Sequence, residues 1–215
     1  GYNIIGIYQT QAELDERLET ITERGAVKPG DYIYDDTNGD KIISPKDVII
    51  QGSPLPSYIF GLTANAAYKG FDFNIHVQGD LGKSAVTSVR GRFEFSYYMY
   101  LNNFDNVLER WHGPGTSSTV ARVFSGDANN RSTINTHFIQ KTDYAKIRHV
   151  ELGYTIPNAI TRKIGIQRLR VFGNVANLAC FTNYIGFEVE RTGSYQRTDV
   201  TPQSRTVSFG ANVQF

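Results

Sequence analysis

The C-terminal residues alternate strictly between apolar and polar or small side chains, and the chain stops on an aromatic ring. Every second residue of the final segment is apolar, namely Val207, Phe209, Ala211, Val213 and Phe215. A period of two over about ten residues is typical of a membrane-barrel strand, which turns one face to lipid and the other to a wet lumen. The last strand of a soluble β-sandwich alternates too, so this segment alone leaves both folds open.

The same pattern returns in two runs that are separated by Lys69 and Gly70. One face carries Tyr58, Phe60, Leu62, Ala64, Ala66 and Tyr68 in the first run, and Phe71, Phe73, Ile75 and Val77 in the second. Two alternating runs around a two-residue turn that contains Gly predict a β-hairpin. The other face of the second run carries Asp72, Asn74, His76 and Gln78. These side chains suit a water-filled interior, and also the exposed face of a sandwich.

Composition excludes several classes of protein. The chain has 215 residues with 13 Tyr, 13 Phe and 20 Gly, which favours a β protein with tight turns. A formal net charge of +1 and the absence of a long Lys/Arg run argue against a nucleic-acid partner. A single cysteine, Cys180, excludes an internal disulfide framework. The sequence contains no apolar run of about 18 residues, so we expect no transmembrane helix.

Further strands are predicted over residues 145–154, with a bulge near Arg148 and His149 where the phase slips, and over residues 169–175. Thr10 and Glu13 have the spacing of a capping box and predict one short helix that runs to about Arg24. Residues 30–57 have a loop-like composition. The chain also starts without a signal peptide, as a fragment of a longer protein would.

The predicted connections alternate in length. Lys69-Gly70 and residues 156–167 are short, whereas residues 9–57, 81–142 and 180–203 are long. Transmembrane barrels join their strands with short periplasmic turns and long extracellular loops. We therefore predict an all-β chain made of antiparallel barrel strands, with the long loops outside the cell.

Five stretches of the sequence resemble, in order, the C-terminal part of SusC/RagA-type TonB-dependent outer-membrane transporters. They are residues 30–40, 58–72, 144–157, 169–184 and 205–215. The resemblance implies a complete barrel of about 22 strands, the size of plugged outer-membrane transporters, with about five or six of them here. The family's plug and TonB-contacting segment have no counterpart in these residues. Residues 1–215 are thus expected to be the C-terminal portion of the barrel domain.

The resemblance also implies a function. A transporter of this family in the bacterial outer membrane would import large nutrients, glycans or oligopeptides, with energy delivered through TonB. Its partners would be a SusD-like surface lipoprotein, the rest of the barrel and plug, outer-membrane lipid, and a second transporter–lipoprotein pair in a dimer. We expect no enzyme, because no catalytic constellation is visible. The alternative is a soluble β-sandwich that binds a ligand, with calcium as its candidate cofactor.

An acidic loop has the spacing of an EF-hand-like calcium site. Oxygen-bearing side chains stand at positions 1, 3, 5, 9 and 12, and a backbone carbonyl at position 7 completes the set. These residues are Asp36, Asn38, Asp40, Ser44 and Asp47, with Ile42 for the carbonyl. Lys41 replaces the Gly expected at position 6, and Asp47 is shorter than the usual Glu. An Asx turn at Asn38-Gly39 explains the same residues without metal.

Two further sets of residues are candidates for recognition. Aromatic side chains concentrate in the long segment before residue 142, where they would stack on a ligand or partner, or pack within the protein. They are Phe93, Phe95, Tyr97, Tyr98, Tyr100 and Trp111. The second set is the terminal motif, which resembles the signal by which outer-membrane barrels are recognised for assembly. Its members are Ser208, Gly210, Val213 and Phe215.

Overall fold

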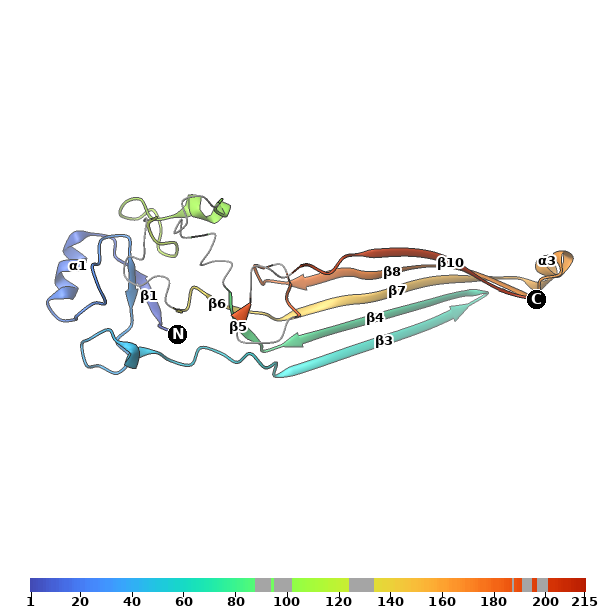
Figure 1. Cartoon of the computed structure of the whole chain (residues 1–215), viewed down its shortest axis with the longest axis horizontal. Coiled ribbons are helices and arrows are strands. Elements are labelled where there is room, and N and C mark those ends of the chain that lie inside the picture. The colour runs from blue at the N-terminus through green and yellow to red at the C-terminus, as the bar shows by residue number, and fades with distance from the viewer. Residues whose placement is uncertain (88–93, 95–101, 124–133, 187, 191–194, 197–200) are drawn as a thin grey trace. The chain divides into compact units, whose positions relative to one another are not determined.

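The structure is a computed structural model that describes residues 1–87, 94, 102–123, 134–186, 188–190, 195–196 and 201–215. The chain divides into two units (Figure 1). Unit 1 comprises Gly1–Pro54, Ser84–Gln140 and Gly193–Asp199. Unit 2 comprises Leu55–Lys83, Lys141–Thr192 and Val200–Phe215.

Unit 2 is a five-stranded antiparallel sheet in which the strands are neighbours in the order of the chain. The strands are β3 (Tyr58–Tyr68), β4 (Phe71–Leu81), β7 (Tyr144–Ile156), β8 (Arg168–Thr182) and β10 (Thr206–Gln214). Figure 1 shows them as long, gently twisted arrows that lie side by side. The predicted strands are therefore confirmed. β3 and β10 form the two edges, and the sheet that the described residues build is not closed.

The short connections lie at one end of this sheet. Lys69 and Gly70 both have positive φ, of 47° and 90°, as a two-residue hairpin turn requires. The pair Tyr68–Phe71 beside this turn is in register with Tyr154 on β7, which leads into α3 (Asn158–Thr161) and η4 (Arg162–Ile164). The C-terminus is at the same end of the sheet (Figure 1). The predicted alternation of short and long connections is confirmed.

The sheet has one apolar and one polar face, as the alternation predicts. Ala66, Phe73, Leu152, Gly173 and Phe209 form a continuous row across all five strands. This row is open to the surroundings, with Leu152 54% and Phe209 84% exposed. A β-sandwich would bury such a face under a second sheet. No second sheet covers it in the described part of unit 2, which favours barrel strands over a sandwich.

A β-bulge on β7 keeps the apolar face continuous. Pairing with β8 shifts between Ile147 and His149, and pairing with β4 shifts between His76 and Val77. Arg148 is the extra residue against β4, which explains why the apolar phase slips between Ile147 and Val150, whereas against β8 the extra residue lies on β8 between Ala176 and Ala179. The predicted bulge is confirmed.

Unit 1 holds shorter elements. β1 (Ile4–Ile7) pairs antiparallel with β2 (Tyr32–Tyr34). β5 (Ser84–Thr87) lies between β6 (Ile139–Lys141) and β9 (Tyr195–Gln196). The single-turn helices η1 (Pro45–Asp47) and η2 (Asp105–Glu109) lie in the connections. Residues 30–57 were expected to be loop throughout, but β2 lies inside them because its tyrosines enter a core. That core comprises Tyr2, Ile7, Tyr32, Tyr34, Ile43 and Ala121.

The predicted helix exists but is shorter than expected. α1 (Gln11–Leu18) begins at Thr10, whose side chain accepts from the backbone N–H of Glu13 at 3.2 Å. It ends six residues before Arg24, because Thr22 leaves the helical path. Thr22 donates to the carbonyl of Lys41 at 2.8 Å and accepts from the N–H of Ile43 at 2.9 Å. This pairing consumes the backbone groups that a longer helix would need.

No helix within the described ranges combines the length and the apolar character that spanning a bilayer would require.

Candidate functional site

The polar face of unit 2 carries a three-strand ion cluster. Arg170 of β8 donates from Nε to Asp72 Oδ1 of β4 at 3.0 Å, and from Nη2 to Glu151 Oε1 of β7 at 2.7 Å. Gly153 of β7 lies between these partners, and a side chain there would collide with the guanidinium. The glycine thus leaves the space that lets one arginine join three strands across the polar face.

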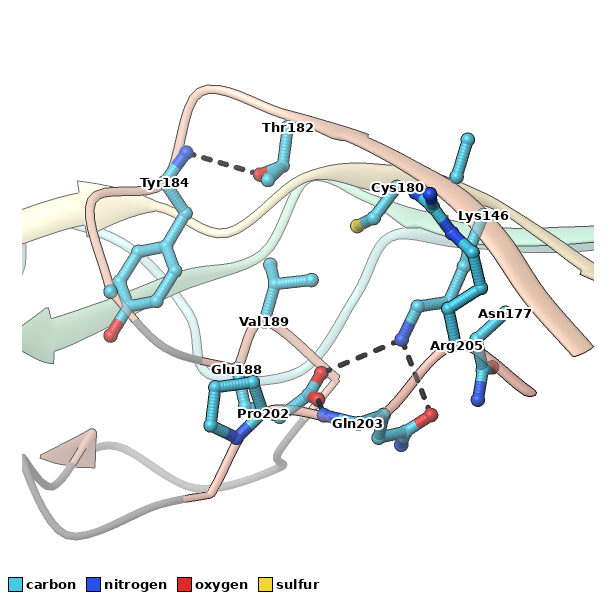
Figure 2. Close-up of a pocket in the computed structure, with 12 residues that line it drawn as sticks. Lys146, Asn177, Cys180, Thr182, Tyr184, Glu188, Val189, Pro202, Gln203 and Arg205 are labelled. Atoms are coloured by element: carbon cyan, nitrogen blue, oxygen red, sulfur yellow. Dashed lines mark hydrogen bonds and ion pairs between the residues drawn. The ribbon is translucent and has the colours of Figure 1, made fainter.

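Closer to the long connections, the same face forms one wall of a pocket of about 330 Å³ (Figure 2). β7 contributes Lys146, and the segment after β8 contributes Glu188, Gln203 and Arg205. The lining residues of β8 are Asn177, Ala179, Cys180 and Thr182. Residues 180–203 were expected to be a loop beyond the strands. Instead β8 continues to Thr182, and part of the following segment lies against the polar face.

Lys146 is the central cation of this pocket. It extends from β7 and is 5% exposed, with its Nζ 3.4 Å from Glu190 Oε1 and 3.8 Å from Glu188 Oε1. Its hydrogen bond goes to Gln203 Oε1 at 3.3 Å. Figure 2 shows the ammonium group between the glutamate and the glutamine. A buried ammonium is thus surrounded by two carboxylates and an amide.

Arg148 contacts two of the residues that Lys146 contacts and makes short hydrogen bonds. It donates to Glu190 Oε2 at 2.7 Å, to Asn177 Oδ1 at 3.0 Å and to Gln203 Oε1 at 2.5 Å. Asn177 has a φ of 54°, a left-handed conformation that asparagine tolerates better than most residues. Arg148 therefore shares Glu190 and Gln203 with Lys146 and has Asn177 as a partner of its own.

A third cation, Lys83, binds the middle of the segment Glu188–Glu190. Lys83 donates to the carbonyl of Val189 at 3.2 Å and to Asp80 at 3.3 Å, and its ammonium lies 5.3 Å from the centre of the Tyr144 ring. Val189 is buried with Tyr144 and Tyr184. Residues 188–190 are therefore fixed to the polar face by two glutamates, one carbonyl and one apolar side chain.

The acidic loop in unit 1 is organised by Asx-type turns. Asp36 accepts from the N–H groups of Gly39 and Lys41 at 2.9 and 2.8 Å, Asn38 accepts from Asp40 at 2.8 Å, and Asp40 accepts from Ile42 at 3.0 Å. Lys41 has a φ of 63° at the position where an EF-hand places Gly.

The last two candidate ligands of the loop cap η1. Ser44 accepts from the N–H of Lys46 at 3.3 Å, and Asp47 is buried and accepts from the N–H of Ser44 at 2.8 Å. Within the described ranges, no three His, Cys, Asp or Glu side chains gather as a metal-binding group. The loop has turns like those of a calcium-binding loop, but the carboxylate of Asp47, its last candidate ligand, accepts hydrogen bonds from backbone N–H groups. Calcium binding here stays a prediction.

We predict that chelation distinguishes the two interpretations of this loop. If calcium binds, the loop should be protected from protease by Ca²⁺ and lose that protection in EGTA, and the double substitution Asp36→Ala with Asp40→Ala should remove the difference. Lys46→Ala, which removes only an exposed partner of Asp40, is the matched control. Protection that EGTA leaves unchanged in the unmutated protein would exclude the metal.

Asp47 gives a pH-dependent prediction. Burial opposes its ionisation, but the N–H donors of Ser44, Asn38 and Thr37 outweigh burial and lower the pKa of its carboxyl group. Its stabilisation is therefore fully present above the unfolded pKa of about 3.9 and is lost as the pH falls through the folded pKa. Asp47→Asn should cost about 1–3 kcal/mol of loop stability at pH 7. Protease protection of residues 36–47, measured from pH 7 to pH 2, should converge for the two proteins at the acid end.

The predicted aromatic set falls largely outside the described residues. Phe93, Phe95, Tyr97, Tyr98 and Tyr100 lie there, and their role in recognition stays a prediction. Trp111 is described, and it packs against the core of unit 1. Its indole N–H donates to Gln9 Oε1 at 3.1 Å, and its ring covers Gly30, where φ is 90° and a side chain would collide with it. The indole thus has a packing role.

The terminal motif lies on edge strand β10. Val213 and Phe215 are exposed and continue the alternation of the apolar face, while the Phe172 ring of β8 covers Gly210. A side chain at position 210 would collide with that ring. Within the motif, Gly210 therefore makes room for the Phe172 ring, and the terminal Phe215 is exposed. Its use as an assembly signal stays a prediction.

Comparisons with known proteins find sequence relatives of this chain. No family model matches the chain. The chain is 27% identical, over its whole length, to the TonB-dependent receptor P26 of Formosa agariphila, and 25% identical over 87% of its length to the TonB-dependent receptor SusC of Bacteroides thetaiotaomicron. It covers 22% and 18% of those proteins. The chain thus spans about a fifth of the length of its curated relatives.

Solved structures show the same fold. The RagAB peptide transporter superposes with a TM-score of 0.74 at 20% identity, over 91% of this chain and 22% of that one. The RagAB peptide importer in the open-open state superposes over the whole chain with a TM-score of 0.73 at 19% identity. This chain corresponds to the C-terminal part of a SusC/RagA-type TonB-dependent receptor.

The SusC/RagA-type assignment fits the sheet, whose edges β3 and β10 are where a larger barrel would continue. The sequence reasoning that led to it missed the pocket on the polar face. Alternation does place Lys146 on that face, as the partner of Gln78 on β4. It gives no signal that Glu188 and Glu190 fold back onto it, because no periodic pattern includes them.

Proposed function

We propose that this chain supplies the last strands of an outer-membrane barrel that imports nutrients in a TonB-dependent manner. The observation that carries the proposal is the exposed apolar face of five antiparallel strands, each 9 to 15 residues long. Strands of about 9–11 residues at a 45° tilt cross the hydrocarbon core. An apolar face of this size needs lipid or protein to cover it, and similarity to TonB-dependent receptors over the whole chain supports lipid.

The orientation follows from the lengths of the connections. Lys69-Gly70 and the α3–η4 connection lie on the periplasmic side, and the long segments with Asp36, Trp111 and Gly186 lie outside the cell. The polar face with Arg170 and Lys146 then lines the lumen. Tyr68, Phe71 and Tyr154, which share one level of the sheet, belong to the periplasmic aromatic girdle with Phe215.

The proposed partners and cargo are those that the resemblance to SusC/RagA-type transporters implies. RagAB is a peptide importer, which supports oligopeptides as cargo. Glycans remain the second class that the sequence resemblance implies. The working assembly contains the rest of the barrel, a plug, TonB contacts through an N-terminal part, and a SusD-like surface lipoprotein, with two such pairs in a dimer. The relatives are named receptors and importers, which supports a role in transport and not in catalysis. Calcium in the acidic loop would stiffen a surface segment that meets the lipoprotein.

The test is growth on defined nutrients. Cells that lack the full-length gene should lose growth on one class of oligopeptide or glycan, and the intact gene should restore it. A gene that ends before Tyr58 should not restore growth, because the barrel would lack its last strands. Membrane fractionation should place the intact protein in the outer membrane. Recovery in the soluble fraction, or unchanged growth on every nutrient, would contradict the proposal.

A further inference from the structure

Lys146 is a buried cation with unused donor capacity. An ammonium group carries three donors, and burying it is costly unless it is paired and hydrogen-bonded. Yet its nearest acceptors lie at 3.3, 3.4 and 3.8 Å, all beyond the 2.7–2.9 Å of a charge-assisted hydrogen bond. Arg148, by contrast, has a carboxylate at 2.7 Å. Among the described residues, Lys146 is therefore neutralised by two carboxylates without a close hydrogen bond.

The carboxylate beside Lys146 is poorly satisfied too. Oε1 of Glu190 is buried and has no hydrogen-bond partner among the described residues, and only the ion pair at 3.4 Å reaches it. The other oxygen of Glu190 is well bonded, to Arg148 and to Gln203 at 2.8 Å. Glu190 is thus held by its second oxygen, and its first oxygen makes only the long ion pair with Lys146.

A second cation lines the same pocket. Arg205 comes from the residues that lead into β10, and its side chain is exposed. In the part of the chain that the structure describes, its guanidinium has no hydrogen-bond or ion-pair partner. Figure 2 shows Lys146, Arg205 and Asn177 together in the pocket wall. The volume of about 330 Å³ far exceeds the roughly 30 Å³ share of one water in the liquid, so a carboxylate fits with part of its parent molecule.

We propose that this pocket is a subsite for a carboxylate group of the imported solute, bound between Lys146 and Arg205. The side-chain amide of Asn177 lies on the same wall beside the two cations; one of its N–H groups donates to the carbonyl of Ser204 at 3.1 Å, and the other is a neutral donor for the carboxylate. Glu188 and Glu190 keep Lys146 in place while the subsite is empty. This inference rests on the proposed import function and adds the class of solute: a peptide with a free carboxylate, or a uronic-acid glycan.

Competition between free and masked carboxylates tests the subsite. Purified full-length transporter in detergent is mixed with equal amounts of free and carboxyl-amidated oligopeptides, and retained peptides are counted by mass spectrometry. A second arm uses oligogalacturonate and its methyl ester. The unmutated protein should enrich the free carboxylate about tenfold in one arm, as expected for one or two charge-assisted hydrogen bonds. The arm that shows the enrichment identifies the source of the carboxylate.

The variants connect the enrichment to the pocket. Arg205→Met and Lys146→Met should each reduce it toward one. Arg168→Met removes a cation of the polar face that lines a different pocket and should leave the preference intact. Lys146→Met removes one positive charge beside Glu188 and Glu190, so Lys146→Met with Glu190→Gln provides a charge-balanced version. The exposed Arg205 carries little folding risk.

Three outcomes overturn the subsite. They are equal retention of free and masked probes by the unmutated protein, no retention in either arm, and a preference that survives both Arg205→Met and the balanced double variant. None of these affects outer-membrane location or nutrient-dependent growth, which test the import function separately.

Discussion

Ile75→Arg is expected to destabilise the folded barrel by about 2–4 kcal/mol, because it places a charge on the lipid face near the middle of β4. Ile75 lies in the central row of the sheet, opposite Ala64 on β3 and Val150 on β7. His76→Arg, one residue later on the polar face, should cost about 1 kcal/mol, the worth of its bond with Thr63 at 2.9 Å. Urea unfolding of the full-length protein in lipid vesicles measures both.

A depth series adds a second control. Phe73 is on the same face as Ile75 but nearer the Lys69-Gly70 end, where the penalty for a charge falls. Phe73→Arg should therefore cost less than Ile75→Arg. Equal losses for Ile75→Arg and His76→Arg would show that the apolar face does not meet lipid.

Arg170→Met should lower the free energy of unfolding by about 2–3 kcal/mol. The substitution leaves Asp72 and Glu151 without their shared cation, and hydrogen bonds to charged groups are worth about 1.5–3 kcal/mol each, reduced here because Asp72 is partly exposed. Arg168→Met is the matched control: it removes the neighbouring inward cation of β8 but none of these bonds. The urea midpoint of the full-length protein is the measurement.

The same cluster provides a rescue. Asp72→Asn with Glu151→Gln, added to Arg170→Met, removes both unpaired charges and should recover part of the loss. If Arg168→Met and Arg170→Met cost the same, or if neutralising the carboxylates recovers nothing, the three-strand cluster does not stabilise the sheet.

Parts of the fold could be predicted from the sequence because they depend on local geometry. Successive side chains of a strand point to opposite faces, so the apolar positions from Tyr58 to Tyr68 had to share one face wherever that strand lay. A two-residue turn at Lys69-Gly70 then forces the next run into an antiparallel partner. The apolar alternation shifts by one residue near Arg148, and this shift predicts a β-bulge because a single extra residue restores the alternation.

Residue spacing was less informative where the same spacing fits both a metal site and a helix cap. Ser44 and Asp47 have the separation of cation ligands, and the same separation lets them cap η1 reciprocally, as the structure shows. Thr10 and Glu13 fixed where α1 begins, but nothing local stopped it at Leu18. Its end depends on Thr22 pairing with residues 41 and 43, which are distant along the chain.

The sequence by itself therefore determined the strands, their faces and the two ends of the sheet, because periodicity encodes orientation about a strand axis. Only the tertiary structure decided which distant groups meet: Trp111 with Gly30, and Glu190 with Arg148 and Lys146. Such pairs form only where the connecting segments bring distant residues together. The path of those segments depends in turn on the partners that buried charges and rings require. The pocket between Lys146 and Arg205 belongs to this second class, since no periodic pattern along the chain relates the residues that line it.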